Sequence, residues 1–198
     1  METVFTTATD KPVETQETLL EHWVRVMEAR DIETKGHTYR VTGISVRLAS
    51  ALGLKDEALL NVRNGALLHD IGKLNVSDSI LHKKEPLNQA EMRIVRTHPK
   101  MAYDMLKHLG FPEPVLEIPY CHHEKWDGTG YPRSLKDEQI PFSARLFAIV
   151  DVYDAMTSNR SYRAAMPRED VLLYLRYQKA RHFDPKIVDV FLSLIATD

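Results

Sequence analysis

The sequence has a single cysteine, no long apolar run and no excess of positive charge over its 198 residues. One cysteine, Cys121, cannot form an intramolecular disulfide, which fits a reducing compartment. No apolar stretch approaches the roughly 18 residues that a membrane helix needs, so we expect no membrane association. The N-terminus also lacks the basic and apolar regions of a secretory signal. These absences together predict a cytoplasmic location.

The charge balance argues against one broad class of partner. The formal net charge is −2 at pH 7, which does not suit a basic surface that holds DNA or RNA. A small phosphorylated ligand is compatible with this balance, because a few local cations can hold it. Eight glycines and ten prolines are few for this length, and we therefore expect long helices.

Apolar residues recur at steps of three and four over most of the chain, and no segment alternates steadily with a period of two. Leu20, Val24 and Met27 show the pattern in the first expected helix. The sequence therefore predicts an all-α fold, a bundle of about seven to nine helices. Residues 1–16 are rich in threonine and are interpreted as a leader or linker stub, and residues 17–198 as one domain.

Two local expectations follow from the same periodicity. The helix that begins near Asp56 is expected to continue to about Gly72. Trp23 and Met27 are expected on an exposed apolar stripe of the first helix, where they could support a homodimer.

The adjacent residues His69 and Asp70 offer an imidazole and a carboxylate as neighbouring metal ligands. A carboxylate can bridge two cations while an imidazole binds one. Gly72 is expected to let the backbone turn away, and Lys73 places a cation beside the pair. Taken alone, the pair is also compatible with a buried histidine and a capping aspartate.

Two histidines near expected helix starts add to this pair. Glu33 and His37 are four residues apart and would share one face of a helix, although an exposed pair at a helix start has the same spacing. His98 precedes Pro99 at an expected helix N-terminus, which is a stiff place to fix an imidazole.

The second half of the chain adds further candidates. His122 and His123 are adjacent, so on a helix their side chains would point about 100° apart. Asp151 lies in an apolar run, where a carboxylate is costly to bury unless a cation or hydrogen bonds compensate it, and Asp154 carries the same cost. Cys121 could also bind a metal, but a lone cysteine is more often a small buried apolar residue.

The candidate ligands all offer a nitrogen or an oxygen atom: Glu33, His37, His69, Asp70, His98, His122, His123 and Asp151. They exceed the needs of one metal ion and suit two or three. Imidazole and carboxylate ligands without a second cysteine favour iron, manganese or another first-row divalent ion. Because two close metals are a standard device for cleaving phosphodiesters, the residues predict a polynuclear metal hydrolase that acts on a phosphate ester.

Four blocks resemble the HD-GYP domain: His69-Asp70-Ile71-Gly72-Lys73, His98, the run from His122 to Pro132 (HHEKWDGTGYP), and Asp151-Val-Tyr-Asp154-Ala155. HD-GYP domains are bacterial phosphodiesterases of cyclic di-GMP within the HD metal-phosphohydrolase superfamily. The resemblance covers roughly residues 20–195. It implies an all-helical fold in which the ligands gather around two or three metals.

The resemblance also implies roles for individual residues. It implies metal ligation by His69, Asp70, His98, His122, His123 and Asp151, and it makes Glu33 with His37 the extra pair of trinuclear members. Asp70 would bridge two metals, and Lys73 would contact a phosphate beside them, so these two are the expected catalytic residues.

Substrate contacts are implied further along the chain. Arg160 and Arg163 match basic positions that contact the phosphates of the ligand, and a guanidinium can bind phosphate oxygens in bidentate fashion. Tyr162 would brace them or stack on a base. The alternative for these residues is a solvated helix end. The loop from Gly128 to Pro132 would shape the rim of the site, with glycines that tolerate positive φ.

This chain departs from the family pattern in two respects. Ala102 stands where many members have glycine, which adds a methyl group and removes no ligand. Such domains also usually follow a receiver or sensor module, so we expect either that the chain works alone or that its regulation comes from another polypeptide, such as a sensor, receiver or GGDEF-domain protein. The remaining histidines match no ligand position and are interpreted as surface or structural residues: His22, His82, His108 and His182.

The expected activity is hydrolysis of cyclic di-GMP to pGpG, and on to GMP, by attack of a metal-bridging hydroxide in line with the departing 3′ oxygen. Two alternatives stay open. One is an HD phosphohydrolase for another nucleotide. The other is a non-catalytic module that binds a cyclic dinucleotide or docks on a GGDEF domain.

Overall fold

The computed structural model describes residues 16–30, 36–159 and 164–196. Within these ranges the chain forms no named strand, and nine α-helices have seven or more residues, while α4 is a single turn. The α-helices are α1 (Gln16–Arg30), α2 (His37–Ala51), α3 (Asp56–Leu67), α4 (Asp78–Leu81), α5 (Gln89–Val95), α6 (His98–His108), α7 (Glu113–Cys121), α8 (Phe142–Thr157), α9 (Arg168–Tyr177) and α10 (Pro185–Ile195), and the 3₁₀ helices are η1 (Ile71–Asn75) and η2 (Asp137–Gln139). The all-α prediction is confirmed.

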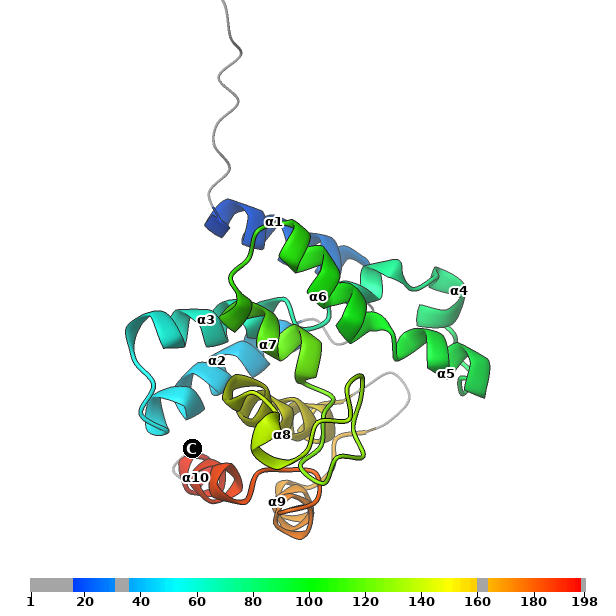
Figure 1. Cartoon of the computed structure of the whole chain (residues 1–198). Coiled ribbons are helices and arrows are strands. Elements are labelled where there is room, and N and C mark those ends of the chain that lie inside the picture. The colour runs from blue at the N-terminus through cyan, green and yellow to red at the C-terminus, as the bar shows by residue number, and fades with distance from the viewer. Residues whose placement is uncertain (1–15, 31–35, 160–163, 197–198) are drawn as a thin grey trace, which may run out of the picture.

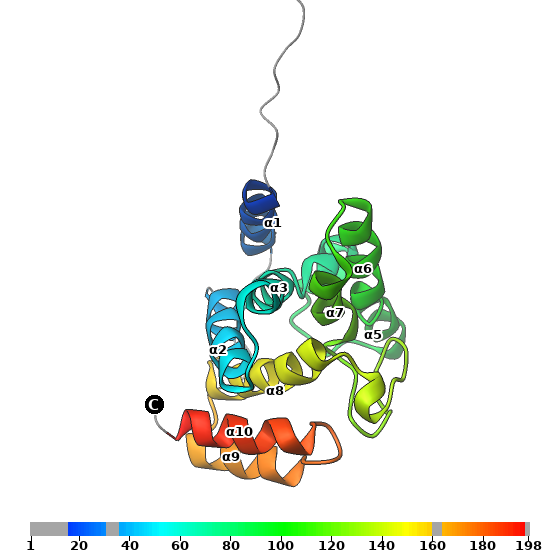
Figure 2. The same cartoon turned by 60° about the vertical axis from the view of Figure 1, so that its left-hand side comes forward.

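The helices pack around a central group formed by α2, α3, α7 and α8, each in contact with the next. On one side, α6 packs against α7 and η1, and α1 covers η1 and α3. On the other side, α9 and α10 lie side by side against α8 (Figures 1 and 2). The α4–α5 segment lies at the edge of the bundle next to the start of α6 (Figure 1).

The two sides of the bundle have separate apolar cores. The larger core joins α2, α8, α9 and α10 and includes the fully buried Phe147 and Phe191. The second core lies under α1, α6 and α7 and includes Leu68 and Leu106. Residues 68–71 run through this second core and lead directly into η1, so burial fixes the segment that carries His69 and Asp70.

Two expectations about the helices are wrong. The third helix ends at Leu67, not near Gly72, and a turn followed by η1 takes its place. The α1 residues Trp23 and Met27 are not an exposed stripe, because Met27 is buried and Trp23 packs against the second core. Met27 therefore contributes no exposed surface to the expected homodimer. No helix among the described residues is long and apolar enough to cross a membrane.

Candidate metal centre

The backbone at His69 and Asp70 is held close to the start of α6. Both residues lie in the turn between α3 and η1, and α6 packs directly on η1. A Cβ atom on Gly72 would collide with the backbone carbonyl of His98, so a glycine is needed for this close approach. We expected Gly72 to let the backbone turn away. The structure shows a different need for glycine, which is the close contact between η1 and the start of α6.

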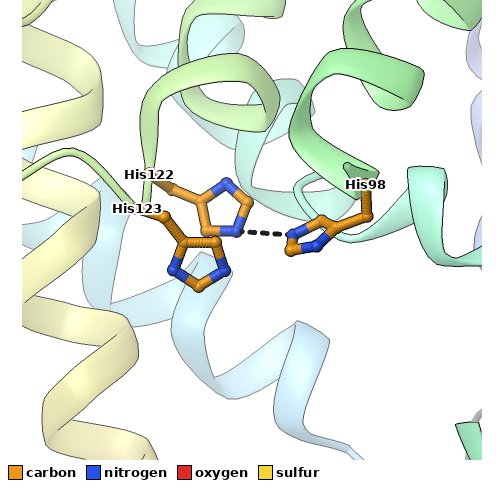
Figure 3. A group of neighbouring side chains, drawn as sticks. All are labelled: His98, His122 and His123. Atoms are coloured by element: carbon orange, nitrogen blue, oxygen red, sulfur yellow. Dashed lines mark hydrogen bonds between the residues drawn. The ribbon is translucent and has the colours of Figure 1, made fainter. Parts of the chain in front are cut away.

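Three histidines face one another between α6 and α7. His98 is the first residue of α6, with proline in the first turn as expected. His122 caps the C-terminal end of α7 and His123 follows it, so both project from the helix end toward His98 (Figure 3). Both residues lie beyond the last residue of α7, and their rings reach the same site, with 4.0 Å between centroids. One ring nitrogen of each of the three lies within 4.8 Å of the other two, and we name these residues the imidazole cluster.

Hydrogen bonds to backbone carbonyls orient two of these rings. His98 Nδ1 lies 2.8 Å from the carbonyl oxygen of Val95, and His122 Nδ1 lies 3.1 Å from that of Ile118. A carbonyl oxygen only accepts, so each Nδ1 donates a proton and each neutral ring has a lone pair on Nε2. The two Nε2 atoms nevertheless lie 3.3 Å apart (Figure 3). Two acceptors at this distance repel each other unless a proton or a metal ion lies between them.

A second cluster lies beside the first and combines imidazoles with a carboxylate. His37, His69 and Asp151 each place a ligand atom within 4.8 Å of the others, and we name them the mixed cluster. His37 Nε2 lies 3.5 Å from Asp151 Oδ1. His69 Nδ1 lies 2.8 Å from the carbonyl oxygen of Ala66, so Nε2 is the nitrogen that faces the site; this buried atom makes no hydrogen bond of good geometry, although Asp70 Oδ2 lies 3.2 Å away.

Asp70 links the two clusters through its two oxygens. Oδ1 lies 3.3 Å from His98 Nε2 and 3.9 Å from His122 Nε2, both in the imidazole cluster. Oδ2 lies 3.2 Å from His69 Nε2 and 2.7 Å from Lys73 Nζ. This arrangement is that of a carboxylate able to bridge two cations, with an ammonium group beside it.

The charges of the site differ between the clusters. Burial holds the pKa of His122 well below its ordinary value and lowers the pKa of His123 to about 3, so these rings are neutral. Burial also lowers the pKa of His37, but hydrogen bonds with Asp151 and Asp154 outweigh it and raise the pKa to about 10. The raised pKa places a proton between His37 Nε2 and Asp151. A metal ion bound by these two residues would take the position of that proton.

A buried carboxylate supports His37 from behind. Asp154 Oδ2 accepts a hydrogen bond from His37 Nδ1 at 2.7 Å. Arg40 donates to both oxygens of Asp154, with Nε 2.7 Å from Oδ1 and Nη2 3.0 Å from Oδ2. This carboxylate–histidine pair is the usual support for a metal-binding imidazole. Sequence reasoning flagged Asp154 as costly to bury but identified neither His37 nor Arg40 as its partner.

The loop that follows His123 is organised by another residue that sequence reasoning left without a role. The buried carboxylate of Glu124 accepts hydrogen bonds from the backbone N–H groups of Arg133 at 2.7 Å and Leu135 at 3.1 Å. A Cβ on Gly130 would collide with the backbone of Glu124. Gly128 has the positive φ that was expected of the loop glycines, whereas Gly130 is required by close contact.

This loop returns a tyrosine to the metal centre. The ring of Tyr131 stacks on His123, with 4.7 Å between centroids and 24° between planes. Burial raises the pKa of the Tyr131 hydroxyl to about 12, which keeps it protonated and able to donate a hydrogen bond.

Several expected site residues are not part of this geometry. The structure brings together His37, His69, Asp70, Lys73, His98, His122, His123 and Asp151. Outside the described residues lie Glu33, Arg160, Tyr162 and Arg163. Because Glu33 lies outside the described residues, the helix face that it was expected to share with His37 stays a prediction; α2 itself begins at His37, after Gly36 with φ of 90°.

The remaining cysteine and histidines lie apart from these clusters. Cys121 is buried in a small apolar group with Ile140 and Ala144, and burial raises the pKa of its thiol to about 12. His22, His82 and His108 are exposed, and His182 stacks on Phe183. None of these five appears in a ligand group found among the described residues.

The donor set fits divalent cations. Imidazole nitrogens from five histidines converge here with the carboxylates of Asp70 and Asp151, and the buried Nε2 of His69 makes no hydrogen bond of good geometry. Imidazole and carboxylate donors of this kind suit first-row divalent metals.

Comparison with known proteins agrees with this geometry. The family model described as HD domain matches residues 23–187. The 3′3′-cGAMP-specific phosphodiesterase 2 of Vibrio cholerae is 39% identical over 182 residues, which are 91% of this chain and 35% of that protein. A cyclic di-GMP phosphodiesterase of Thermotoga maritima is 37% identical over 169 residues, which are 84% of this chain and 46% of that protein. The chain thus spans less than half the length of these relatives.

A solved structure shares the fold. The cyclic GMP-AMP specific phosphodiesterase V-cGAP3 of V. cholerae superposes with a TM-score of 0.68 and 21% identity, covering 90% of this chain and 49% of that one. The resemblance to HD-GYP phosphodiesterases is confirmed by the family match and the curated relatives. The chain belongs to the HD domain family.

Proposed function

We propose that this protein is a metal-dependent phosphodiesterase that hydrolyses cyclic di-GMP to pGpG and then to GMP. The observation that carries the proposal is the pair of imidazoles at the centre. His98 and His122 present unprotonated Nε2 atoms to each other at 3.3 Å, and Asp70 adds a carboxylate oxygen 3.3 Å from the former. A metal ion held between these atoms would remove the repulsion between the two nitrogens and offset the charge of the carboxylate.

The two clusters provide separate holding sites. His98, His122 and His123 would hold one ion, and His37, His69 and Asp151 a second, with Asp70 shared. Iron or manganese suits these donors, and Glu33 is the proposed ligand for a third ion. Bound divalent ions would supply Lewis acidity to the phosphoryl oxygens and lower the pKa of a water molecule.

The chain's own residues orient the diester and manage its charge. Lys73 Nζ lies 2.7 Å from Asp70 and so sits where it can donate to a phosphoryl oxygen next to that carboxylate. Arg160 and Arg163, with Tyr162, are proposed to bind the substrate beyond the centre. Asp154 keeps the Nδ1 proton of His37 in place, which leaves Nε2 of that ring turned toward Asp151.

A second candidate substrate comes from the relatives. The V. cholerae relative at 39% identity is specific for 3′3′-cGAMP, whereas the T. maritima relative acts on cyclic di-GMP. The alternative substrate for this chain is therefore another 3′–5′ cyclic dinucleotide, with the same diester chemistry.

The test combines a metal count with a product assay on protein purified without oxygen. We expect two or three iron or manganese ions per chain, and conversion of cyclic di-GMP to pGpG and GMP followed by chromatography. Cyclic di-GMP, 3′3′-cGAMP and cyclic di-AMP are compared under identical conditions. Intact substrate in all three reactions with metal-loaded protein would overturn the enzyme proposal and favour a non-catalytic binding module. Accumulation of pGpG alone would refute only the second cleavage.

A further inference from the structure

Three planar groups stack outward from the imidazole cluster, namely the rings of His123 and Tyr131 and the guanidinium of Arg96. The ring of Tyr131 stacks on His123, and the guanidinium carbon of Arg96 lies 5.1 Å from the Tyr131 ring centroid. Arg96 caps the C-terminal end of α5, two residues before His98. The guanidinium therefore stands at the edge of the metal centre, held from one side by a cation–π contact.

The described part of the chain gives Arg96 no carboxylate partner. Arg96 is exposed, and among the described residues its side chain makes a cation–π contact with Tyr131 but no ion pair or hydrogen bond. By contrast, Arg40 beside the mixed cluster is paired with Asp154. An arginine kept beside a metal centre without an anion is available for an anion that arrives from solution.

The geometry of the contact also limits what Arg96 can bind. The Tyr131 ring lies against the guanidinium of Arg96, and the N–H groups of the guanidinium remain as donors. Two parallel N–H bonds of a guanidinium match two oxygens of a phosphate. A cyclic dinucleotide carries two phosphodiester groups, and only one of them can occupy the metal centre at a time.

We infer that Arg96 binds the second, non-reacting phosphate of a cyclic dinucleotide, with Tyr131 as the platform that holds its guanidinium. The inference rests on the proposed function and adds a binding residue from the α5–α6 turn. Arg96 would therefore strengthen the binding of a cyclic dinucleotide, but not the binding of a diester that has a single phosphate.

The experiment compares Arg96→Ala and Arg96→Lys with a matched control, Arg93→Ala. Arg93 is an exposed arginine one turn earlier in α5. Initial rates are measured for cyclic di-GMP, 3′3′-cGAMP and bis(p-nitrophenyl) phosphate, which has one phosphate. Metal content and thermal unfolding of each variant show that the centre and the fold are intact.

We expect Arg96→Ala to raise KM for the cleaved cyclic dinucleotide by about tenfold, which is the usual scale for one charge-assisted contact. The rise for bis(p-nitrophenyl) phosphate should be at least about fivefold smaller, and Arg96→Lys should fall between Arg96→Ala and the wild type. The control should leave both KM values within about twofold of the wild type.

Two results would overturn the inference, and they differ from each other. If the wild type cleaves a cyclic dinucleotide and Arg96→Ala behaves like Arg93→Ala, or impairs both kinds of substrate equally, Arg96 does not bind the second phosphate. If the metal-loaded wild type cleaves no cyclic dinucleotide, the proposed function is wrong, and the inference about Arg96 is wrong as well.

Discussion

The imidazole cluster and the mixed cluster are supported in different ways. In the imidazole cluster, His98 and His122 are fixed by backbone carbonyls, and burial keeps the pKa of both rings below the ordinary value. In the mixed cluster, His37 is fixed by a side chain, Asp154, and hydrogen bonds with carboxylates raise its pKa to about 10. The first cluster is neutral and rigid, whereas the second contains charges that other side chains must hold.

This difference shows which parts of the centre can be altered by substitution. A backbone carbonyl cannot be removed without moving a helix, so the orientation of the imidazole cluster depends on the packing of α6 and α7. The orientation of His37 depends on two side chains, Asp154 and Arg40. Substitutions can therefore weaken the mixed cluster alone, while the imidazole cluster responds to changes in packing or in the shared Asp70.

The largest effect is expected where the clusters meet. Asp70→Asn removes the negative charge that faces both of them, and we expect metal content to fall in both and activity on cyclic di-GMP to drop by about 10³-fold or more. Metal analysis and product chromatography measure the two effects. Asp104→Asn is the control, because Asp104 is exposed and paired with Lys100, away from both clusters. Retention of full metal content by Asp70→Asn would show that the clusters do not share this carboxylate.

The next effect tests the packing that supports the imidazole cluster. Gly72→Ala would push η1 away from the His98 carbonyl, and overpacking of this kind costs roughly 1–3 kcal/mol. For a chain of this size we expect unfolding to occur about 3–10 °C lower, with loss of metal from the imidazole cluster. The measurement is thermal unfolding with and without added manganese.

Gly43→Ala provides the matched comparison for that substitution. Gly43 lies within α2, and an added Cβ would meet no atom within 4 Å. Alanine there should raise the free energy of unfolding by about 0.5–1 kcal/mol, because it has the higher helix propensity. Equal destabilisation by both substitutions would mean that the approach of η1 to α6 is not the cause.

Periodicity predicted the helices well because their apolar faces are local features. Phe142–Thr157 forms the buried α8 that the apolar run indicated, and His98 begins α6 beside its proline as expected. The end of α3 was misjudged because Leu68 and Ile71 continue the apolar pattern beyond Leu67. They are buried in the second core although the backbone there has left the α-helix, and the sequence pattern records burial, not backbone geometry.

The sequence predicted most of the residues that the structure brings together at the centre, but not the side chains that support them. His69 and Asp70 carry an adjacent pattern that is visible in the sequence, whereas Asp154 and His37 are 117 positions apart and their contact depends on the packing of α2 against α8. Glu124 lies within the motif, but its bonds are to backbone N–H groups, which no side-chain pattern reveals.

A smaller effect should separate the clusters. Asp154→Asn leaves an oxygen for the Nδ1 proton of His37 but removes the charge, and loss of such a supporting carboxylate typically costs about 10–100-fold in metal affinity or activity. We expect one metal site to weaken in a manganese titration while the other is unchanged. Asp189→Asn, at an exposed carboxylate paired with Lys179, is the control. Parallel weakening of both sites would refute the independence of the two supports.

The smallest expected effect is at Arg40, which acts on His37 only through Asp154. Its guanidinium makes two bonds to that carboxylate, but 41% of its side chain is exposed, so water can replace part of the interaction. We expect Arg40→Gln to weaken metal binding at the mixed cluster by roughly two- to tenfold, less than Asp154→Asn does. In the double variant the two losses should not add, because both act on one imidazole. Additive losses in the titration would instead give Arg40 a separate role, independent of Asp154 and His37.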